Sequence, residues 1–164
     1  ERVRERGVAV VPEGHRVLGA LSVADNLRVA ASHRPAREVD AAIDDVLQVL
    51  PELRAKLENP GRSLSGGQKQ MVAVAQALLA RPRYLVVDEL SLGLAPLVVK
   101  RLAELLRLVA SRGTGVLLIE QFTSLALEMA AQANVLVRGR MAWSGPCGDL
   151  IARPDILERS YLGS

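Results

Sequence analysis

A serine and two glycines at the start of a helical segment are the first feature of this sequence that could bind a ligand. Ser65–Gly67 opens the segment 65–80, whose apolar residues have helical spacing, and Gln68 follows directly. The first backbone N–H groups of a helix have no intrahelical partner and lie at the positive end of its dipole. Glycines there let a phosphate approach the backbone closely, so the segment is suited to bind an anion. Taken alone, the tripeptide is better explained as a helix cap and a loop, and only the full string Leu64–Gln68 with the motif that follows favours an anion site.

An acidic pair follows a short apolar segment about twenty residues further on. Leu85–Val87 has the composition of a buried strand, and it ends at Asp88 and Glu89. Parallel strands present their carboxyl ends to ligands. There one carboxylate can hold Mg²⁺ through water, while its neighbour orients and polarises an attacking water. Such pairs also simply begin loops, and it is the order of both motifs together that favours phosphate chemistry.

Strands and helices alternate in the second half of the chain. This alternation is typical of a mostly parallel sheet flanked by helices. An earlier apolar run, ended by Pro12, predicts one more buried strand. The predicted strands are 7–11, 84–87, 116–119, 134–137 and 141–144, and the predicted helices of this half are 96–110, 122–131 and 148–152.

A helical block lies between the first two predicted strands. Ser22 is expected to cap a helix that runs to about residue 31. Apolar residues recur with helical spacing over 37–57, and Pro51 breaks that run. The segment 65–80 adds a third helix. The pattern therefore predicts an inserted, all-helical part of the fold.

Composition excludes several classes of protein. Of 164 residues, 49% are apolar and 24% charged, which are ordinary globular values, whereas the 2% of aromatics argue against a stacking platform for single-stranded nucleic acid. The net charge of +3 is spread along the chain, so no basic arm stands out. Cys147 is the only cysteine, which rules out an intrachain disulfide. The two histidines, His15 and His33, are expected to face solvent.

The order of these motifs resembles the ATP-binding subunits of ABC transporters. Leu64–Gln68 matches the signature motif of that family, and Leu85–Glu89 matches its Walker B strand and catalytic glutamate. The resemblance implies an α/β fold of the P-loop NTPase type, with a mostly parallel sheet, flanking helices and an inserted helical subdomain. It assigns residues 1–164 to one partial ATPase domain. Its expected parts are the helical subdomain at 20–80, which carries the signature motif, and the α/β core with the C-terminal end at 1–19 and 81–164.

A narrower resemblance is to the ATPases that import branched-chain amino acids. It implies a subunit that binds and hydrolyses ATP and drives a membrane permease. ATPases for urea or amide import and for lipopolysaccharide export share parts of the pattern and remain the alternatives. The segments that resemble the branched-chain ATPases are Val11–Arg16, Leu21–Leu27, Ser91–Pro96, Glu120–Gln121 and Tyr161–Gly163.

The family resemblance also implies a role for individual residues. Glu89 is implied to be the catalytic residue that acts on the hydrolytic water, and Asp88 to hold Mg²⁺ through water. The residues implied to contact the nucleotide are Ser65, Gly66, Gly67, Gln68, Glu13 and Gln121. The loop implied to cross a dimer interface consists of Ser91, Leu92, Gly93, Leu94 and Ala95.

Partners follow from the same resemblance. The signature motif of such subunits contacts ATP held mainly by the opposite subunit, so a homo- or heterodimer of ATPase subunits is implied. The dimer would bind ATP and Mg²⁺, contact permease subunits at the cytoplasmic face of a bacterial inner membrane, and serve a substrate-binding protein indirectly. Nucleic acid is not an expected partner. ABC ATPases of DNA repair are disfavoured, because only about fifty residues separate Glu13 from Ser65 and they contain no sustained heptads.

Several positions depart from the family pattern. Leu90 replaces a usual proline, Gln76 a common arginine and Phe122 a usual polar residue. Glu13 and Gln121 stand where most relatives have glutamine and histidine, respectively. No Gly-x-x-x-x-Gly-Lys-Ser/Thr string occurs in the sequence. We therefore expect a piece of a longer chain that does not hydrolyse ATP by itself. A remnant that only offers its signature motif to an intact partner stays open.

Overall fold

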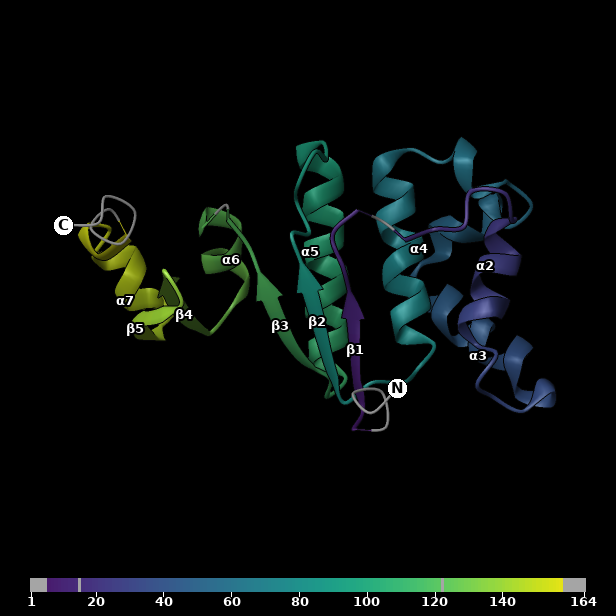
Figure 1. Ribbon diagram of the computed structural model, residues 1–164, viewed down its shortest axis with the longest axis horizontal. Helices are drawn as coiled ribbons and strands as arrows, with labels where there is room; N and C mark the ends of the chain where they lie inside the picture. Colours follow the sequence, from purple (N-terminus) through teal and green to yellow (C-terminus); the bar gives the residue numbers. More distant parts are fainter. Residues whose placement is uncertain (1–5, 15, 122, 158–164) are drawn as a thin grey trace. The chain divides into compact units, whose positions relative to one another are not determined.

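The computed structural model describes residues 6–14, 16–121 and 123–157 (Figure 1). Expectations for His15, Phe122 and Tyr161–Gly163 therefore lie outside the described residues. The contacts divide the chain into two compact units, Glu1–Ile119 and Glu120–Ser164. Every helix in the described part of the chain is too short or too polar to span a bilayer.

Three parallel strands form the sheet of the first unit (Figure 1). They are β1 (Val8–Val11), β2 (Tyr84–Asp88) and β3 (Gly115–Ile119), with β2 in the centre. In the register of β1 and β2, Val11 lies opposite Val87. Because all three strands run in the same direction, their carboxyl ends meet at one edge. The parallel sheet that the sequence predicts is confirmed.

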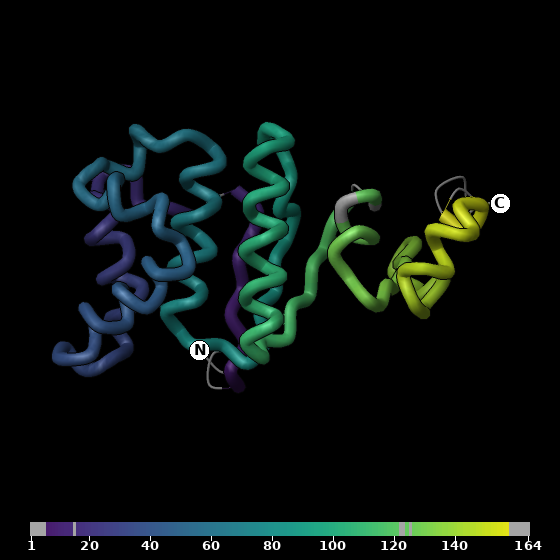
Figure 2. The backbone as a smooth tube through the Cα atoms, turned by 180° about the vertical axis from the view of Figure 1, so that it is seen from behind, coloured from purple at the N-terminus to yellow at the C-terminus, as the bar shows by residue number. Residues whose placement is uncertain are grey.

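Helix α5 (Pro96–Ser111) covers one face of this sheet, as the front and back views show (Figures 1 and 2). Its proline lies in the first turn, where the missing N–H costs no hydrogen bond. Burial alternates along β2, since Leu85 and Val87 are fully buried whereas Tyr84 is 53% exposed. The core of the unit is aliphatic. The buried side chains of α5 are Leu102, Ala103, Leu105, Leu106 and Val109.

The segment between β1 and β2 is helical, as predicted. The helical run expected over 37–57 is interrupted before Pro51, because proline cannot donate the next helical hydrogen bond. The elements of this block are α2 (Val23–Ala30), α3 (Ala36–Val49), the 3-10 turns η1 (Pro51–Lys56) and η2 (Gly61–Ser63), and α4 (Gly66–Leu78).

A fully buried asparagine joins α2 to the chain that precedes it. Asn26 Oδ1 accepts a hydrogen bond from Leu18 N at 2.8 Å, and Asn26 Nδ2 donates to the carbonyls of Leu18 at 3.0 Å and Ser22 at 2.9 Å. Gln76 Nε2 lies 3.4 Å from both the carbonyl oxygen and Oδ1 of Asn26. The glutamine that departs from the family pattern therefore joins α4 to this buried amide.

The same segment is also tied to the loop that leads into α4. Gly61 N donates to Leu21 O at 2.8 Å, and Arg62 N donates to Gly19 O at 3.0 Å. A Cβ at position 61 would lie 2.8 Å from the carbonyl oxygen of Leu18, so only glycine permits this approach. Movement of either segment must therefore be shared by the other.

We expect Asn26→Ala to lower the free energy of unfolding by about 3 kcal/mol, because it leaves backbone groups of the buried segment without partners. Ser22→Ala removes the exposed side-chain cap of α2, in which Ser22 Oγ accepts from Asp25 N at 3.0 Å and donates to Asp25 Oδ2 at 2.7 Å, and should cost about 1 kcal/mol. Urea denaturation followed by circular dichroism compares the two variants. A loss for Asn26→Ala no larger than that for Ser22→Ala would contradict the role given to the buried amide.

The second unit contains a helix, an antiparallel hairpin and a short helix. The two-residue turn of the hairpin is formed by Arg138 and Gly139, both with positive φ (49° and 76°), the conformation that favours tight hairpins. The thiol of Cys147 is buried, which raises its pKa. The elements of this unit are α6 (Thr123–Met129), β4 (Gln132–Val137), β5 (Arg140–Pro146) and α7 (Cys147–Ala152).

Candidate functional site

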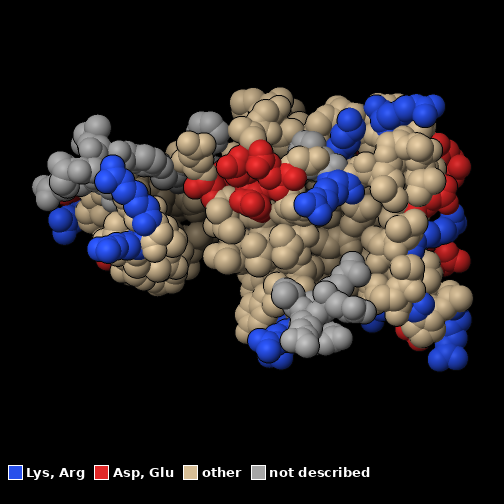
Figure 3. Space-filling model, in the orientation of Figure 1, with Lys and Arg blue, Asp and Glu red and all other residues tan. Residues whose placement is uncertain are grey.

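The acidic pair lies at the carboxyl edge of the sheet. Asp88 is the last residue of β2 and pairs with Ile119, and Glu89 N donates to Ile119 O at 2.9 Å. Both carboxylate residues are half-buried. The exposed Glu13 follows β1 at the same edge, after Val11. Figure 3 shows acidic side chains gathered over the region where these strands end.

Glu89 has a left-handed backbone, with φ at 49°. A non-glycine residue in this conformation costs about 1–3 kcal/mol, and such strain is concentrated at functional sites. The turn at Glu89 lets the next side chain, Leu90, enter the core, where it is 1% exposed. Leu90 in place of the family's proline is thus a core residue, and its burial offsets strain at its neighbour.

Relief of this strain gives a direct test. We expect Glu89→Gly to raise the free energy of unfolding by about 1 kcal/mol, because glycine adopts positive φ without a steric cost. Glu89→Gln keeps the Cβ and should leave stability within about 0.5 kcal/mol of the original chain. Chemical denaturation of both variants measures the difference. Equal stabilities for Glu89→Gly and Glu89→Gln would show that no strain is stored at this residue.

The start of α4 is closed by a reciprocal cap. Ser65 Oγ accepts from Gln68 N at 3.3 Å, and Gln68 Oε1 accepts from Ser65 N at 3.0 Å. The first intrahelical bond runs from Lys69 N to Ser65 O at 2.9 Å. The N–H groups of Gly66 and Gly67 therefore lie at the positive end of a helix of 13 residues. This arrangement has the donors and the space that an anion needs.

Gln68 also takes part in the helix cap, a structural role that the resemblance to the signature motif did not predict. Its amide oxygen belongs to the cap, and only the NH₂ group is left to donate to a ligand. The serine-x-x-glutamine spacing of a capping box was present in the sequence and could have indicated this.

The segment Ser91–Ala95 forms a turn between β2 and α5. Leu94 N donates to Ser91 O at 3.2 Å, and Gly93 has φ at 69° with open space around its Cβ position. Exposed apolar side chains lie in this turn and just after it: Leu92 is 44% exposed, and Leu97, in the first turn of α5, is 79% exposed. Such exposure is typical of surfaces that another protein covers.

The structure thus brings part of the predicted site together. Asp88, Glu89 and the segment that begins with Glu13 share one edge of the sheet, and the capped end of α4 belongs to the same unit. Gln121 follows β3 in the sequence and belongs to the second unit, where it is exposed. Within the described residues, no group of three or more His, Cys, Asp or Glu side chains could enclose a metal ion.

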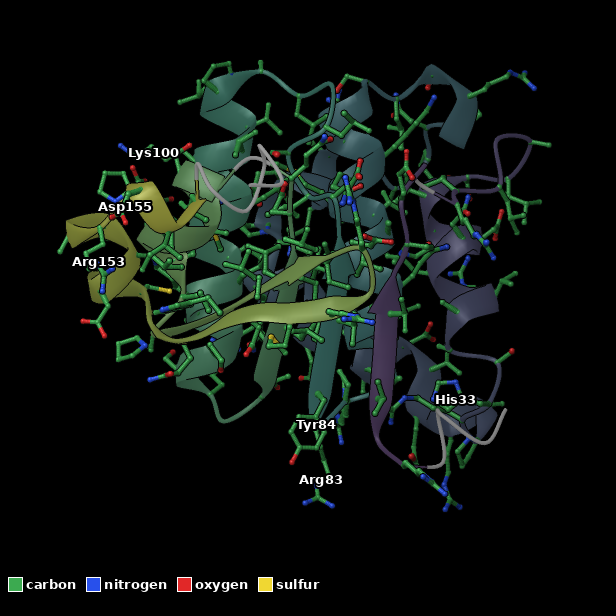
Figure 4. All side chains as sticks on the ribbon, turned by 60° about the vertical axis from the view of Figure 1, so that its left-hand side comes forward. His33, Arg83, Tyr84, Lys100, Arg153 and Asp155 are labelled. Atoms are coloured by element: carbon green, nitrogen blue, oxygen red, sulfur yellow. The ribbon has the colours of Figure 1, made fainter. Side chains whose placement is uncertain are left out.

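A cavity of about 240 Å³ lies at the opposite end of the first unit, beside the residues that begin β2 and β3. Two of its three arginines are already engaged, because Arg34 donates to Leu79 O at 2.9 and 2.7 Å and Arg81 pairs with Asp45 at 2.8 Å. Figure 4 shows Arg83, Tyr84 and His33 at this end, away from the acidic edge. The cavity is therefore separate from the candidate site. Further lining residues are Val46, Val49, Val109 and Thr114.

Comparison with known protein families shows to which family the chain belongs. A family model described as "ABC transporter" matches residues 1–91, more than half of the chain. The chain belongs to the ABC transporter ATP-binding family. Members of this family hydrolyse ATP in transport.

Similar family members carry names that specify transport. The chain is 34% identical over 161 residues to BraG of Pseudomonas aeruginosa, a high-affinity branched-chain amino acid transport ATP-binding protein. It is 36% identical over 146 residues to LivF of Archaeoglobus fulgidus, a probable protein of the same kind. These matches cover 98% and 88% of this chain but only 69% and 62% of the two relatives. The chain therefore spans about two thirds of their length. LptB of Acidithiobacillus ferridurans, from a lipopolysaccharide export system, is 30% identical over 165 residues, which is 99% of the chain and 67% of LptB.

Solved structures agree with the fold. The ADP conformation of MJ1267, an ATP-binding cassette of an ABC transporter, superposes with a TM-score of 0.84 at 20% identity. The match covers 99% of this ABC chain and 71% of that cassette. The expected fold of the P-loop NTPase type is therefore confirmed.

Proposed function

We propose that this chain is part of the ATP-binding and hydrolysing subunit of an importer for branched-chain amino acids. The observation that carries the ATPase proposal is the strained, half-buried Glu89 beside Asp88 at the carboxyl edge of a parallel sheet. The names of BraG and LivF support the choice of cargo.

The capped end of α4 is the proposed contact for the γ-phosphate of ATP. The N–H groups of Gly66 and Gly67 lie at the positive end of the helix, and the hydroxyl of Ser65 is exposed beside them. Neither glycine carries a side chain that would hold a phosphate away. In the proposed dimer this ATP is held mainly by the second subunit, so each site takes residues from two chains.

Asp88 is the proposed partner of Mg²⁺. A single carboxylate at a strand end can hold Mg²⁺ through water while phosphate oxygens supply the other ligands. When bound, Mg²⁺ neutralises charge that develops on the phosphate oxygens. The half-buried position of Asp88 at the strand end suits this task.

Glu89 is proposed to orient the attacking water and to accept its proton. The left-handed turn fixes the carboxylate at the edge of the sheet while Leu90 anchors the chain behind it. A positioned general base contributes about 10²–10⁴-fold to the rate of such a reaction. Glu13 and Gln121 are proposed to approach the nucleotide from the segments that follow β1 and β3.

The exposed turn Ser91–Ala95 is the proposed dimer contact, because apolar side chains there lack cover within the described chain. The dimer is proposed to work with permease subunits at the cytoplasmic face of the inner membrane, and with a binding protein indirectly. A different cargo is the second candidate, since LptB from a lipopolysaccharide export system is 30% identical. A remnant that depends on an intact partner for turnover is the third.

We expect Glu89→Gln to reduce ATP turnover by the assembled transporter about 10²–10⁴-fold while ATP still binds, because the amide cannot accept the proton of the attacking water. Phosphate release and equilibrium binding of ATP measure the two effects. Glu58→Gln, at an exposed position of the helical block, is the matched control and should hydrolyse ATP normally. Unchanged turnover in Glu89→Gln would overturn the proposed mechanism.

The cargo is tested separately in liposomes that contain the complete transporter. ATP hydrolysis should be stimulated by leucine together with the binding protein, and labelled leucine should accumulate. Stimulation by urea or lipopolysaccharide instead of leucine would overturn the cargo while leaving the ATPase proposal in place.

A further inference from the structure

The first turns of α4 and α5 approach each other more closely than ordinary side chains allow. Gly67 is buried, and a Cβ added there would lie 2.5 Å from Val98 Cγ1 and 3.3 Å from Val98 Cβ. A contact at 2.5 Å is not tolerated, so a larger residue would force the helices apart. The second glycine of the motif is therefore needed for packing as well as for access of an anion.

An ion pair lies one turn further along α5. Arg101 Nε donates to Glu52 Oε1 on η1, and Arg101 Nη1 lies 3.9 Å from Glu104 Oε2. The side chains of Arg101 and Glu52 are 36% and 38% exposed. Burial raises the pKa of Glu52 and is the largest single influence, but the hydrogen bond from Arg101, a backbone hydrogen bond and the charge of Arg101 together outweigh it, so the net pKa lies below the ordinary value. The pKa of Arg101 is raised, chiefly by its hydrogen bond to Glu52. The pair is thus ionised at neutral pH.

Helix α5 is also closely connected to the acidic end of β2. Only the six residues 90–95 separate Glu89 from Pro96, the first residue of α5. The connection begins at Leu90, which is 1% exposed, and leads into a helix whose Leu102 is fully buried. A shift of α5 relative to β2 would have to disturb the core.

We propose that Val98 and Arg101 are positioning residues that fix the capped end of α4 relative to the acidic end of β2 within one chain. The consequence for catalysis rests on the proposed function, in which these two segments serve two different ATP molecules of the dimer. Through α5, a displacement at one ATP is passed to the residues of the same chain that contact the other. Val98 transmits the displacement through its contact with Gly67, and Arg101 transmits it through its ion pair with Glu52 in the helical block.

The packing contact is tested by compensation. Gly67→Ala should lower the melting temperature of the chain by about 5 °C, and Val98→Ala in the same chain should restore most of this loss by removing the methyl groups that the new Cβ meets. Gly148→Ala is the matched control, because it is a helical glycine whose Cβ position has open space. It should not lower the melting temperature. Failure of Val98→Ala to rescue Gly67→Ala would overturn the proposed contact.

The ion pair is tested by hydrogen exchange at the cap of α4. In Arg101→Met the amides of Ser65, Gln68 and Lys69 should exchange about two- to fivefold faster, whereas amides of β2 should not change. The charge reversal Glu52→Arg with Arg101→Glu should restore slow exchange.

Lys100→Met is the control for loss of a positive charge on the same turn of α5 and should leave the cap unchanged; Lys100 is exposed and labelled in Figure 4. Uniformly faster exchange in Arg101→Met throughout the first unit, or no change at the cap, would overturn the proposal. No nucleotide is present in these measurements, so they fail or succeed independently of the ATPase experiment.

Discussion

Parallel pairing of β2 with both of its neighbours determines where this chain can carry out chemistry. The register places Asp88 opposite Ile119, and the ladder continues for one residue through the hydrogen bond from Glu89 N to Ile119 O. Two carboxylates are thereby held at the edge where β1 also ends. A shift of one residue would exchange the buried and exposed sides of β2 and remove Leu85 and Val87 from the core. The hydrophobic core and the acidic edge therefore depend on the same register.

Strain at Glu89 and burial at Leu90 belong to this arrangement. The left-handed residue turns the chain sharply at the end of β2, and the next side chain enters the core. The same core holds α5, which packs against Gly67 of the signature motif. Residues proposed to serve two nucleotides are thus joined through one layer of aliphatic packing. The departures Leu90 and Gln76 contribute to that layer and to the buried amide of Asn26, respectively, instead of disrupting the fold.

Local patterns predicted the helices and strands of the fold well. The alternation of short apolar runs and helical spacing gave the parallel sheet, and Pro51 ended α3 as expected. Features that depend on contacts between residues far apart in the sequence could not be predicted in this way. The ion pair of Glu52 and Arg101 spans 49 positions, and the close approaches at Gly61 and Gly67 depend on neighbours that only the fold brings near. Helical spacing and charge patterns carry no information about such contacts. The positive φ of Glu89 could not be predicted either, because a glutamate side chain does not indicate a left-handed backbone.

The central claim is a composite ATP site formed by the signature segment of one subunit and the acidic edge of another. The most direct measurement is a structure of the complete transporter with a non-hydrolysable ATP analogue and Mg²⁺. The account predicts the γ-phosphate against the N–H groups of Gly66 and Gly67 of one subunit, with Asp88 and Glu89 of the other beside the metal and the water. A nucleotide bound away from both segments, or held by a single subunit alone, would contradict it.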